Sequence, residues 1–268
     1  MRFGDYITET SYQHYDDVGR RTKEISKEEA FKLLKTKCSA ALKGTPIYRG
    51  IERFDGDYGY ADPRHSPVAR ISRNTENYYT FMIDNSPAWK GWPKRSKSFI
   101  CSTDDMKASG YGNMMQVFPV NGTKIGVCPM SDIFSSFDAV KRFYPVMSYF
   151  NIGIDNIFKN FYIHPSEIKS YKDLKKAFKT VTVRIKEFDD AGKLEEITDL
   201  FGPMFFYAYT SGDMLKYIEG LLDPRKNNFR LKKAGDKLPT DNEVWTEGPC
   251  VLVDYDAIHL HKVLKELI

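Results

Sequence analysis

The sequence predicts an α+β protein in which a sheet-forming core carries a long, largely helical insertion. Short runs of β-branched and aromatic residues, bounded by glycine or proline, recur before and after the middle of the chain. Between them, residues 131–235 repeat apolar side chains with a helical period. The chain has 268 residues, 41% of them hydrophobic, which is enough to bury a core. We expect a single domain over residues 1–268 with the insertion at 131–235.

The first predicted helix lies in the stretch "SKEEAFKLLKTKCSAALKG". Ser26 and Glu29 have the spacing of a capping box, in which the serine accepts from the backbone of the third helical residue. Apolar residues then recur with a helical period from Ala30 to Cys38. The pattern predicts about four turns that end near Gly44, because glycine commonly follows the last helical turn.

A short strand is predicted next in "TPIYRG", with Arg49 on it or at its end. Residues 52–98 are irregular and rich in Gly, Pro, Asn, Arg and aromatic residues. They contain one predicted helix, "NTENYYTFMIDNS", followed by the loop "PAWKGWPKR". A loop of this length in a compact domain usually has a function.

Three further strands are predicted in "SFICSTD", "GNMMQVFPV" and "TKIGVCPM", the last two separated by the turn "NGT". Within the insertion, helical spacing is found in "DAVKRFYPVMSYF", "SYKDLKKAFKTVTVRIKEF" and "DMLKYIEGLL". The insertion ends in the basic, polar stretch "DPRKNNFRLKKAGDKLP". Strand signals resume at Val244, an apolar run typical of a buried strand follows the Gly248-Pro249 turn, and the chain closes on a helix.

The composition excludes several classes of protein. The net charge of +4 arises from 40 basic and 36 acidic residues, which permits contact with phosphates without demanding it. Cysteines occur only at Cys38, Cys101, Cys128 and Cys250, with no C-x-x-C pair. This spacing favours neither a zinc knuckle nor a secreted disulfide framework, and it predicts a reducing compartment.

Targeting and metal signals are also weak. The N-terminus lacks the apolar stretch of a signal peptide, and no run approaches the length of a membrane span. We expect no membrane contact and a cytoplasmic protein, or one delivered by a route other than a secretory signal. His259 and His261, two positions apart on a predicted helix, point in different directions. We therefore expect no metal site.

Three short motifs follow one another along the chain: "YRG" with Arg49, "SFICSTD" with Ser102 and Thr103, and "DNEVW" with Glu243. Together they resemble the R-S-E class of mono-ADP-ribosyltransferases, the clostridial-toxin-like and phage-encoded enzymes that transfer ADP-ribose from NAD. In that family an arginine ends the first strand, an S-T-S motif opens a later one, and a glutamate of E-x-E or Q-x-E precedes another. The motifs cover only a small part of the chain.

The resemblance implies the family's split β-sandwich core with flanking helices, and NAD as co-substrate. Glu243 would accept a hydrogen bond from the ribose 2′-hydroxyl and offset the positive charge that develops as nicotinamide leaves. Arg49 would grip the pyrophosphate. The backbone of Gly50 would approach the nicotinamide amide. Ser102 would orient Glu243 by a hydrogen bond, and Thr103 would support the strand.

Asp241 occupies the position at which the family carries the E or Q that handles the acceptor. A carboxylate there suits an acceptor that loses a proton or is held as a cation, such as an arginine guanidinium or a base amine. Aspartate is shorter than the family's residue, so the arginine acceptor stays open. Glu247 is a second candidate for the catalytic glutamate. We prefer Glu243 because Val-Trp follows it much as in the family, whereas Glu247 adjoins a turn.

Aromatic and basic side chains between Arg49 and Ser102 fall where the family folds its NAD pocket. We expect Tyr78 and Tyr79 to contact NAD, although core packing is the commoner role for such residues. The other aromatic and basic residues of this region are Trp89, Trp92, Arg70, Arg73, Lys94 and Arg95. Its basic side chains are either solvated or contact phosphates.

The implied activity is that of a glycosyltransferase, moving ADP-ribose from NAD to a macromolecular nitrogen. Its acceptor is a protein arginine or a nucleic-acid base amine, in a toxin-like or phage-conflict role such as a toxin–antitoxin system, phage defence or RNA modification. The span from Ser102 to Glu243 is longer than the family's compact domain needs. The insertion would choose the target, bind an inhibitor or antitoxin protein, or merely pack. The alternative is a catalytically inactive module of the same fold that holds nucleic acid or a host protein.

Overall fold

The computed structural model describes residues 22–52, 54–65, 77–145 and 147–260. The chain divides into two compact units, each built from segments distant in sequence. The sheet unit comprises Met1–Arg73, Trp92–Asp132 and Phe229–Ile268, and the helical unit comprises Asn74–Gly91 and Ile133–Asn228. The longer segment of the helical unit, Ile133–Asn228, nearly coincides with the insertion predicted at 131–235. The unit also includes residues 74–91, which the sequence analysis places outside the insertion.

The sheet unit contains one antiparallel sheet with the strand order β1-β3-β9-β5-β2-β4-β8-β6-β7. Its strands are β1 (Lys23–Glu24), β2 (Ile47–Ile51), β3 (Tyr58–Ala61), β4 (Phe99–Ser102), β5 (Asn113–Pro119), β6 (Lys124–Val127), β7 (Arg230–Lys233), β8 (Glu243–Thr246) and β9 (Cys250–Asp254). The α+β class predicted from the sequence is confirmed.

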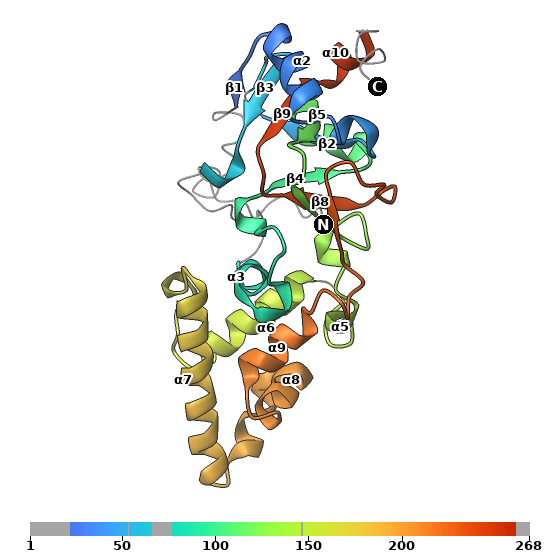
Figure 1. The fold of residues 1–268 in the computed structure, drawn as a ribbon. Coiled ribbons are helices and arrows are strands. Elements are labelled where there is room, and N and C mark those ends of the chain that lie inside the picture. The colour runs from blue at the N-terminus through green and yellow to red at the C-terminus, as the bar shows by residue number, and fades with distance from the viewer. Residues whose placement is uncertain (1–21, 53, 66–76, 146, 261–268) are drawn as a thin grey trace. The chain divides into compact units, whose positions relative to one another are not determined.

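The sheet is nearly divided at its centre. β2 and β4 are joined through a single pair of facing residues, Tyr48 and Ser102, whereas β2 and β5 share five such pairs. Figure 1 shows β4 and β8 running across the direction of β3 and β9. The first five strands in the order and the last four therefore form two halves that meet at one point.

The core of the sheet unit lies on both faces of the sheet. One face buries a cluster that includes Ile47, Cys101, Met115 and Val244. On the other face, helix α2 (Lys27–Thr36) packs Ala30, Leu34 and neighbouring residues against β3, β5 and β9. The burial of these apolar side chains, together with the strand pairing, fixes the register, because a slip of one residue would exchange the two faces.

Helix α2 begins as predicted and ends earlier than predicted. Ser26 caps it by accepting the Glu29 N–H at 3.2 Å. The helix stops at Thr36, and a short 3₁₀ turn at Ala41–Lys43 follows in place of the last predicted turns. The cause is a long-range contact, since the N–H of Asn121 donates to the carbonyl of Lys37 at 2.7 Å.

Three strands lie where the sequence gives no strand signal. β1 precedes the first predicted helix, in a stretch for which no strand is predicted. β3 occupies part of the stretch 52–98, which the sequence predicts as irregular apart from one helix, and β7 occupies the basic tail of the predicted insertion. β7 reads "RLKK" and is an edge strand, where charged side chains are tolerated because one side of the strand faces water. The smaller helices of this unit are α4 (Asp105–Ser109) and α10 (Tyr255–Leu260).

The helical unit is built from α3 (Tyr78–Asn85), α5 (Asp138–Lys141), α6 (Met147–Asn160), α7 (Tyr171–Asp190), α8 (Leu194–Thr210) and α9 (Met214–Leu221). The helical patterns predicted in "NTENYYTFMIDNS" and within the insertion each correspond to one or two of these helices, whereas α8 lies in a stretch for which no helix is predicted. Their apolar faces meet in an aromatic core that includes Phe158 and Phe178, whose rings lie 5.1 Å apart. Among the described helices, none is long and apolar enough to cross a membrane.

Candidate functional site

The three motif strands are neighbours in the sheet. β4 lies between β2 and β8, so segments far apart in the sequence come together. The register places Tyr48 opposite Ser102, and Ser102 opposite Glu243. Facing residues of an antiparallel pair point to the same side of the sheet. Tyr48, Ser102 and Glu243, with Trp245 two positions further along β8, therefore define one side, which we call the site face.

Arg49 lies on the opposite side of the sheet from Ser102 and Glu243. It follows Tyr48 directly in β2, and successive side chains of a strand alternate between faces. Its partner in β5 is Met115, a fully buried residue of the core cluster. Only 6% of Arg49 is exposed. The expected grip on a pyrophosphate needs an accessible guanidinium beside Glu243, and the structure differs on this point.

The contacts of Arg49 give it a structural role. Its Nη1 donates to the carbonyl of Ile100 in β4 at 2.5 Å, and its guanidinium carbon lies 5.6 Å from the ring centre of Phe99. The side chain therefore ties β2 to β4 next to the single facing pair that joins them. A planar, permanently charged group over an aromatic ring suits this position better than an ammonium would.

Gly50 is required by the packing of the chain against itself. A Cβ at this position would lie 2.7 Å from the carbonyl carbon of Tyr111 and 2.9 Å from the backbone nitrogen of Gly112. The connection between α4 and β5 thus crosses β2 at this point. The space that a side chain would take at Gly50 is filled by the chain itself, at the position where the resemblance predicts a close approach of nicotinamide.

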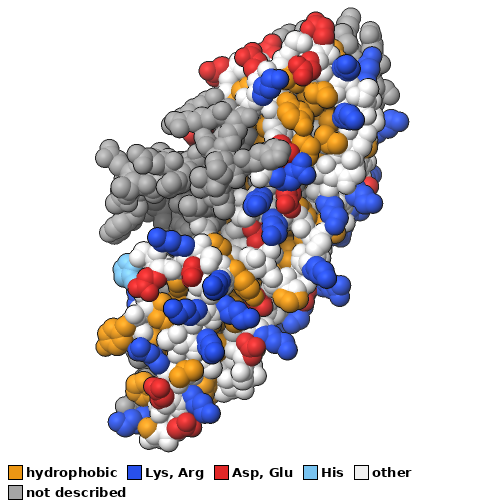
Figure 2. All heavy atoms as spheres, turned by 60° about the vertical axis from the view of Figure 1, so that its left-hand side comes forward, with side chains coloured by type: hydrophobic (Ala, Val, Ile, Leu, Met, Phe, Trp, Pro, Cys, Tyr) orange, Lys and Arg blue, Asp and Glu red, His pale blue; other side chains and the backbone are white. Residues whose placement is uncertain are grey.

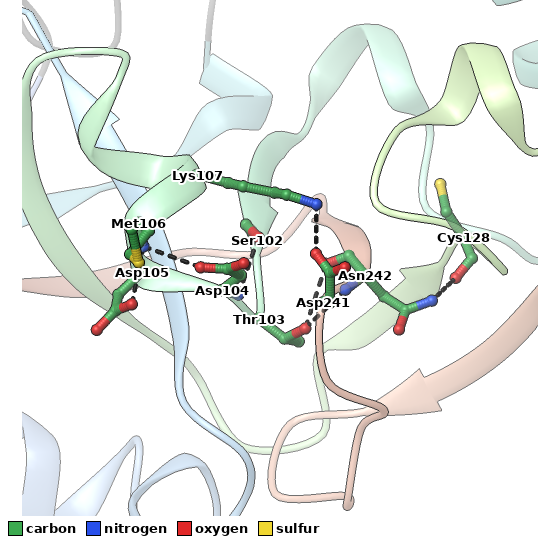
Figure 3. Close-up of polar contacts among 9 residues, drawn as sticks. All are labelled: Ser102, Thr103, Asp104, Asp105, Met106, Lys107, Cys128, Asp241 and Asn242. Carbon is green, nitrogen blue, oxygen red and sulfur yellow. Dashed lines mark hydrogen bonds and ion pairs between the residues drawn. The ribbon is translucent and has the colours of Figure 1, made fainter.

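Ser102 and Thr103 fix the turn that follows β4 (Figure 3). The Oγ of Ser102 accepts the N–H of Asp104 at 2.9 Å, and Asp104 in turn caps α4 by accepting the N–H of Met106 at 2.9 Å. The hydroxyl of Thr103 accepts the backbone N–H of Asn242 at 2.9 Å, and the Thr103 N–H donates to the Asn242 carbonyl at 3.0 Å. The expected support of the strand by Thr103 therefore takes the form of a clamp on the segment that enters β8.

The side chain of Asn242 contacts Cys128, the residue that follows β6. Its amide donates to the carbonyl of Cys128 at 2.7 Å, and the side chain is buried. The residue before it, Asp241, has a φ of +61°, a left-handed conformation that aspartate tolerates better than most residues. The sharp bend at Asp241 and the anchored amide at Asn242 together set the direction in which Glu243 enters the strand.

Asp241 is exposed and paired with Lys107 of α4 (Figure 3). The side chains of the aspartate and the lysine are 60% and 43% exposed. An ion pair this open to water contributes little to stability. The carboxylate is accessible, as a group that handles a macromolecular acceptor must be, and the lysine places a positive charge beside it.

Glu243 is largely buried and forms an ion pair with Arg95. The Nη1 of Arg95 lies 2.6 Å from the Oε1 of Glu243, with side-chain exposures of 5% and 13%. The Sγ of Cys128 lies 3.9 Å from the same oxygen. The sequence predicts Arg95 to be a solvated or phosphate-binding residue of a loop. It is instead buried against the candidate catalytic glutamate.

Glu247, the second candidate for the catalytic glutamate, has a different environment. Its Oε2 accepts the backbone N–H of Lys94 at 2.8 Å. It lies just beyond the end of β8, whereas Glu243 is the first residue of that strand and faces Ser102. The geometry favours Glu243 as the residue that belongs to the motif constellation.

Tyrosines near Ser102 add neutral donors to the same region. The hydroxyl of Tyr255 donates to Asp105 at 2.8 Å, and this hydrogen bond raises the pKa of Tyr255 to about 12. The ring of Tyr255 meets that of Tyr48 edge-on at 5.7 Å, and burial raises the pKa of Tyr48. Both phenols therefore stay protonated at neutral pH.

Tyr78 and Tyr79, expected to contact NAD, belong to the helical unit and are buried in it. Tyr78 donates to Asp155 at 3.1 Å and meets the ring of Phe158 at 5.6 Å. Tyr79 packs against Phe134 with ring centres 5.5 Å apart. The alternative, core packing, describes these contacts, because both tyrosines are almost fully buried and each packs against a phenylalanine ring.

Charge does not single out a partner. On the face drawn in Figure 2, basic side chains are spread among acidic ones over the described part of the surface. Within the described residues, no group of three or more His, Cys, Asp and Glu side chains could hold a metal ion. Arg70, Arg73 and His261 lie outside the described residues.

Comparison with known proteins adds no relative. A scan against protein-family models and searches of curated proteins and of solved structures find no match to this chain.

Sequence reasoning missed Arg95 as a site residue. The signal available was weak, because an arginine in a loop rich in lysine and proline is usually solvated. What distinguishes Arg95 is its place beside the "SFICST" strand, which pairs with the strand that carries Glu243. Only the sheet order brings these two segments together.

Proposed function

We propose that the chain is a mono-ADP-ribosyltransferase that moves ADP-ribose from NAD to a nitrogen on a protein or a nucleic acid. One observation carries the proposal. The arginine, serine-threonine and glutamate motifs lie on three adjacent strands, with Ser102 facing Glu243 across the β4–β8 pair. The near division of the sheet between β2 and β4 further supports a split core of the family's type.

The residues of the site face fit the ribose end of NAD. NAD supplies a glycosidic bond to nicotinamide, whose cleavage leaves positive charge on the ribose. Glu243 places a carboxylate, held by Arg95, at the entrance to β8. Its role is to accept the ribose 2′-hydroxyl and to stabilise the developing charge, an interaction that strengthens in the transition state. Ser102 and Thr103 hold the two strand ends that define the place of this carboxylate.

The motif residues account less well for binding of the NAD pyrophosphate. Arg49 is buried on the other side of the sheet and bonded to Ile100, so it supports the strands rather than a ligand. We therefore assign Arg49 no contact with NAD. The proposal rests on the ribose side of the site.

Asp241 and Lys107 are the groups that we assign to the acceptor. Both are exposed, and they lie beside the segment that leads into Glu243. A carboxylate near the reacting centre helps an amine or guanidinium to lose its proton as the new bond forms. The charge pattern of the surface favours neither a protein nor a nucleic acid, so the acceptor class is left to experiment. We infer a toxin-like or phage-conflict role from the motif resemblance alone.

A second candidate function is a binding module of the same fold without catalytic activity. The buried pairing of Glu243 with Arg95 favours it, because a carboxylate already neutralised by a guanidinium stabilises a new positive charge less well. In this case the exposed Asp241 and Lys107 would contact a partner without chemistry.

Labelled NAD distinguishes the two candidates and identifies the acceptor. The purified chain is incubated with cell lysate and NAD labelled in the adenylate part, and the products are divided between protease and nuclease treatment. Label that survives nuclease and is lost to protease identifies a protein acceptor, and the reverse identifies a nucleic acid. If no macromolecule is labelled and free NAD is not cleaved, the chain is a binding module.

A further inference from the structure

The segment 92–98 is attached to β8 by contacts along most of its length. Trp92 stacks on Trp245, with ring centres 6.0 Å apart and planes inclined by 18°. The indole Nε1 of Trp245 donates to the carbonyl of Pro93 at 2.8 Å. The N–H of Lys94 donates to Glu247 at 2.8 Å. Arg95 follows immediately and is therefore carried on a backbone that is fixed against the strand of Glu243.

Arg95 is also held directly. Its guanidinium carbon lies 5.8 Å from the ring centre of Trp245, and its Nη1 lies 2.6 Å from Glu243. Trp245 and Glu243 are two positions apart in β8, so they share the site face. The indole forms the floor on which the guanidinium lies, and the carboxylate is its charged partner.

Burying this arginine has an energetic cost. Removing a guanidinium and a carboxylate from water carries a large desolvation cost for each ion, which their mutual attraction offsets only when the geometry is good. A hydrophobic pair of similar volume would often be at least as stable. The pair is thus poorly explained by stability alone. Its contacts restrict where the carboxylate can lie, because the guanidinium packs against Trp245 and meets one oxygen of Glu243.

We propose that Arg95 is a positioning residue that acts through Glu243. It holds the carboxylate in one orientation at the entrance to β8, in the role that the motif resemblance gives to Ser102. The inference rests on the proposed ADP-ribosyltransferase function. It predicts that Arg95 affects the rate of NAD cleavage but not the affinity for NAD, because a guanidinium that is only 5% exposed is not accessible to a ligand.

The test is a double-mutant cycle on NAD cleavage by the full chain, with the variants Arg95→Lys, Glu243→Asp and both together. For Arg95→Lys we expect kcat to fall on the order of 10²-fold, as for a misplaced catalytic group. The dissociation constant for NAD, measured by equilibrium dialysis, should change by less than about twofold, because uniform binding is untouched. The double variant should be no slower than the slower single variant, because both changes displace the same carboxylate.

Two further variants keep the test decisive. Arg184→Lys makes the same chemical change at an exposed position of α7 and should leave kcat unchanged. If Arg95→Lys does not fold, as judged by circular dichroism, Trp92→Leu loosens the same segment at a partly exposed residue and should again lower kcat without changing NAD affinity.

The outcomes separate the inference from the function on which it rests. Losses that multiply in the double variant, an unchanged kcat in Arg95→Lys, or a loss of NAD affinity would each overturn the positioning role while leaving the enzyme intact. If Trp92→Leu has to stand in for Arg95→Lys, an unchanged kcat or a loss of NAD affinity in that variant overturns the role in the same way. A wild-type chain that does not cleave NAD would instead overturn the proposed function, and the inference with it.

Discussion

Replacing Glu243 by glutamine is expected to reduce both stability and activity, by amounts that the structure allows us to work out. The carboxylate lies 2.6 Å from Arg95. Two unit charges at that separation attract by about 6 kcal/mol at an effective dielectric constant of about 20. Desolvation cancels part of this attraction, and removing one partner of a buried pair typically costs about 3–5 kcal/mol. Glutamine keeps a carbonyl oxygen as an acceptor, so we expect a loss near the lower end, about 3 kcal/mol.

In thermal unfolding this loss corresponds to a fall in Tm of roughly 6–12 °C, since 1 kcal/mol shifts a unit of this size by about 2–4 °C. The rate of nicotinamide release should fall on the order of 10²- to 10³-fold, because the charge that opposes the ribose cation is removed. Unfolding is followed by circular dichroism and nicotinamide release by chromatography, at a temperature where both proteins are folded.

Glu247→Gln is the matched control. Glu247 accepts a backbone N–H of Lys94, and an amide oxygen can accept the same hydrogen bond. We expect a change in stability of less than about 1 kcal/mol and an unchanged rate. If Glu247→Gln abolishes activity and Glu243→Gln retains it, the catalytic glutamate has been assigned to the wrong position. If Glu243→Gln leaves Tm unchanged, the ion pair does not contribute to the fold as described.

Four further predictions follow from single residues. Arg49→Lys should lower stability by about 1–3 kcal/mol, because the buried guanidinium bonds a carbonyl of β4; a loss of NAD affinity at unchanged Tm would return this residue to the NAD site. Asp241→Ala should reduce transfer to the acceptor more than NAD hydrolysis, and equal loss of both would show that it does not handle the acceptor. Gly50→Ala should destabilise by about 1–3 kcal/mol, as overpacking against backbone does, whereas Gly220→Ala in helix α9, with a nearest neighbour at 3.7 Å, should stabilise by about 0.5–1 kcal/mol; comparison of their Tm values tests the packing. Burial raises the pKa of Cys38 to about 11, above its unfolded value of about 9. The unfolded thiol therefore loses its proton first, so this residue should make stability fall between pH 9 and pH 11 by about 1.4 kcal/mol per pH unit, and a Cys38→Ala variant should lack this part of the decline.

The motif strands could be predicted from the sequence because their signals are local. The runs at 47–51 and 99–102 combine β-prone residues with neighbouring glycine, proline or polar residues, and both are strands. Ser26 likewise begins α2, because a capping box is read within four residues. The end of α2 could not be predicted, since it depends on Asn121, which is distant in sequence.

The side of the sheet on which each motif residue lies could not be predicted either. Arg49 and Glu243 fall on opposite faces because Tyr48, and not Arg49, faces Ser102. A register shifted by one residue would have reversed this result. No local sequence pattern fixes the register between strands that are so far apart in the chain. Such information comes only from the packing of both faces.

Burial also separates the roles that the sequence suggests for some residues from the contacts that these residues make in the structure. Tyr78 and Tyr79 are residues of the type that stacks on ligands, but they belong to a helix and pack against neighbouring aromatic rings. Arg95 lies in a stretch with the composition of a solvated loop, but the pairing of β4 with β8 places it against Glu243. In both cases a tertiary contact outweighed the local preference of the side chain.

Release of nicotinamide from NAD by the purified chain, compared with its Glu243→Gln variant, tests whether the chain is an ADP-ribosyltransferase that uses Glu243. If the chain is an ADP-ribosyltransferase that uses Glu243, the wild type releases nicotinamide and the variant does so on the order of 10²- to 10³-fold more slowly, while both bind NAD with similar affinity. A wild type that binds no NAD, or that releases nicotinamide no faster than the variant, would contradict it.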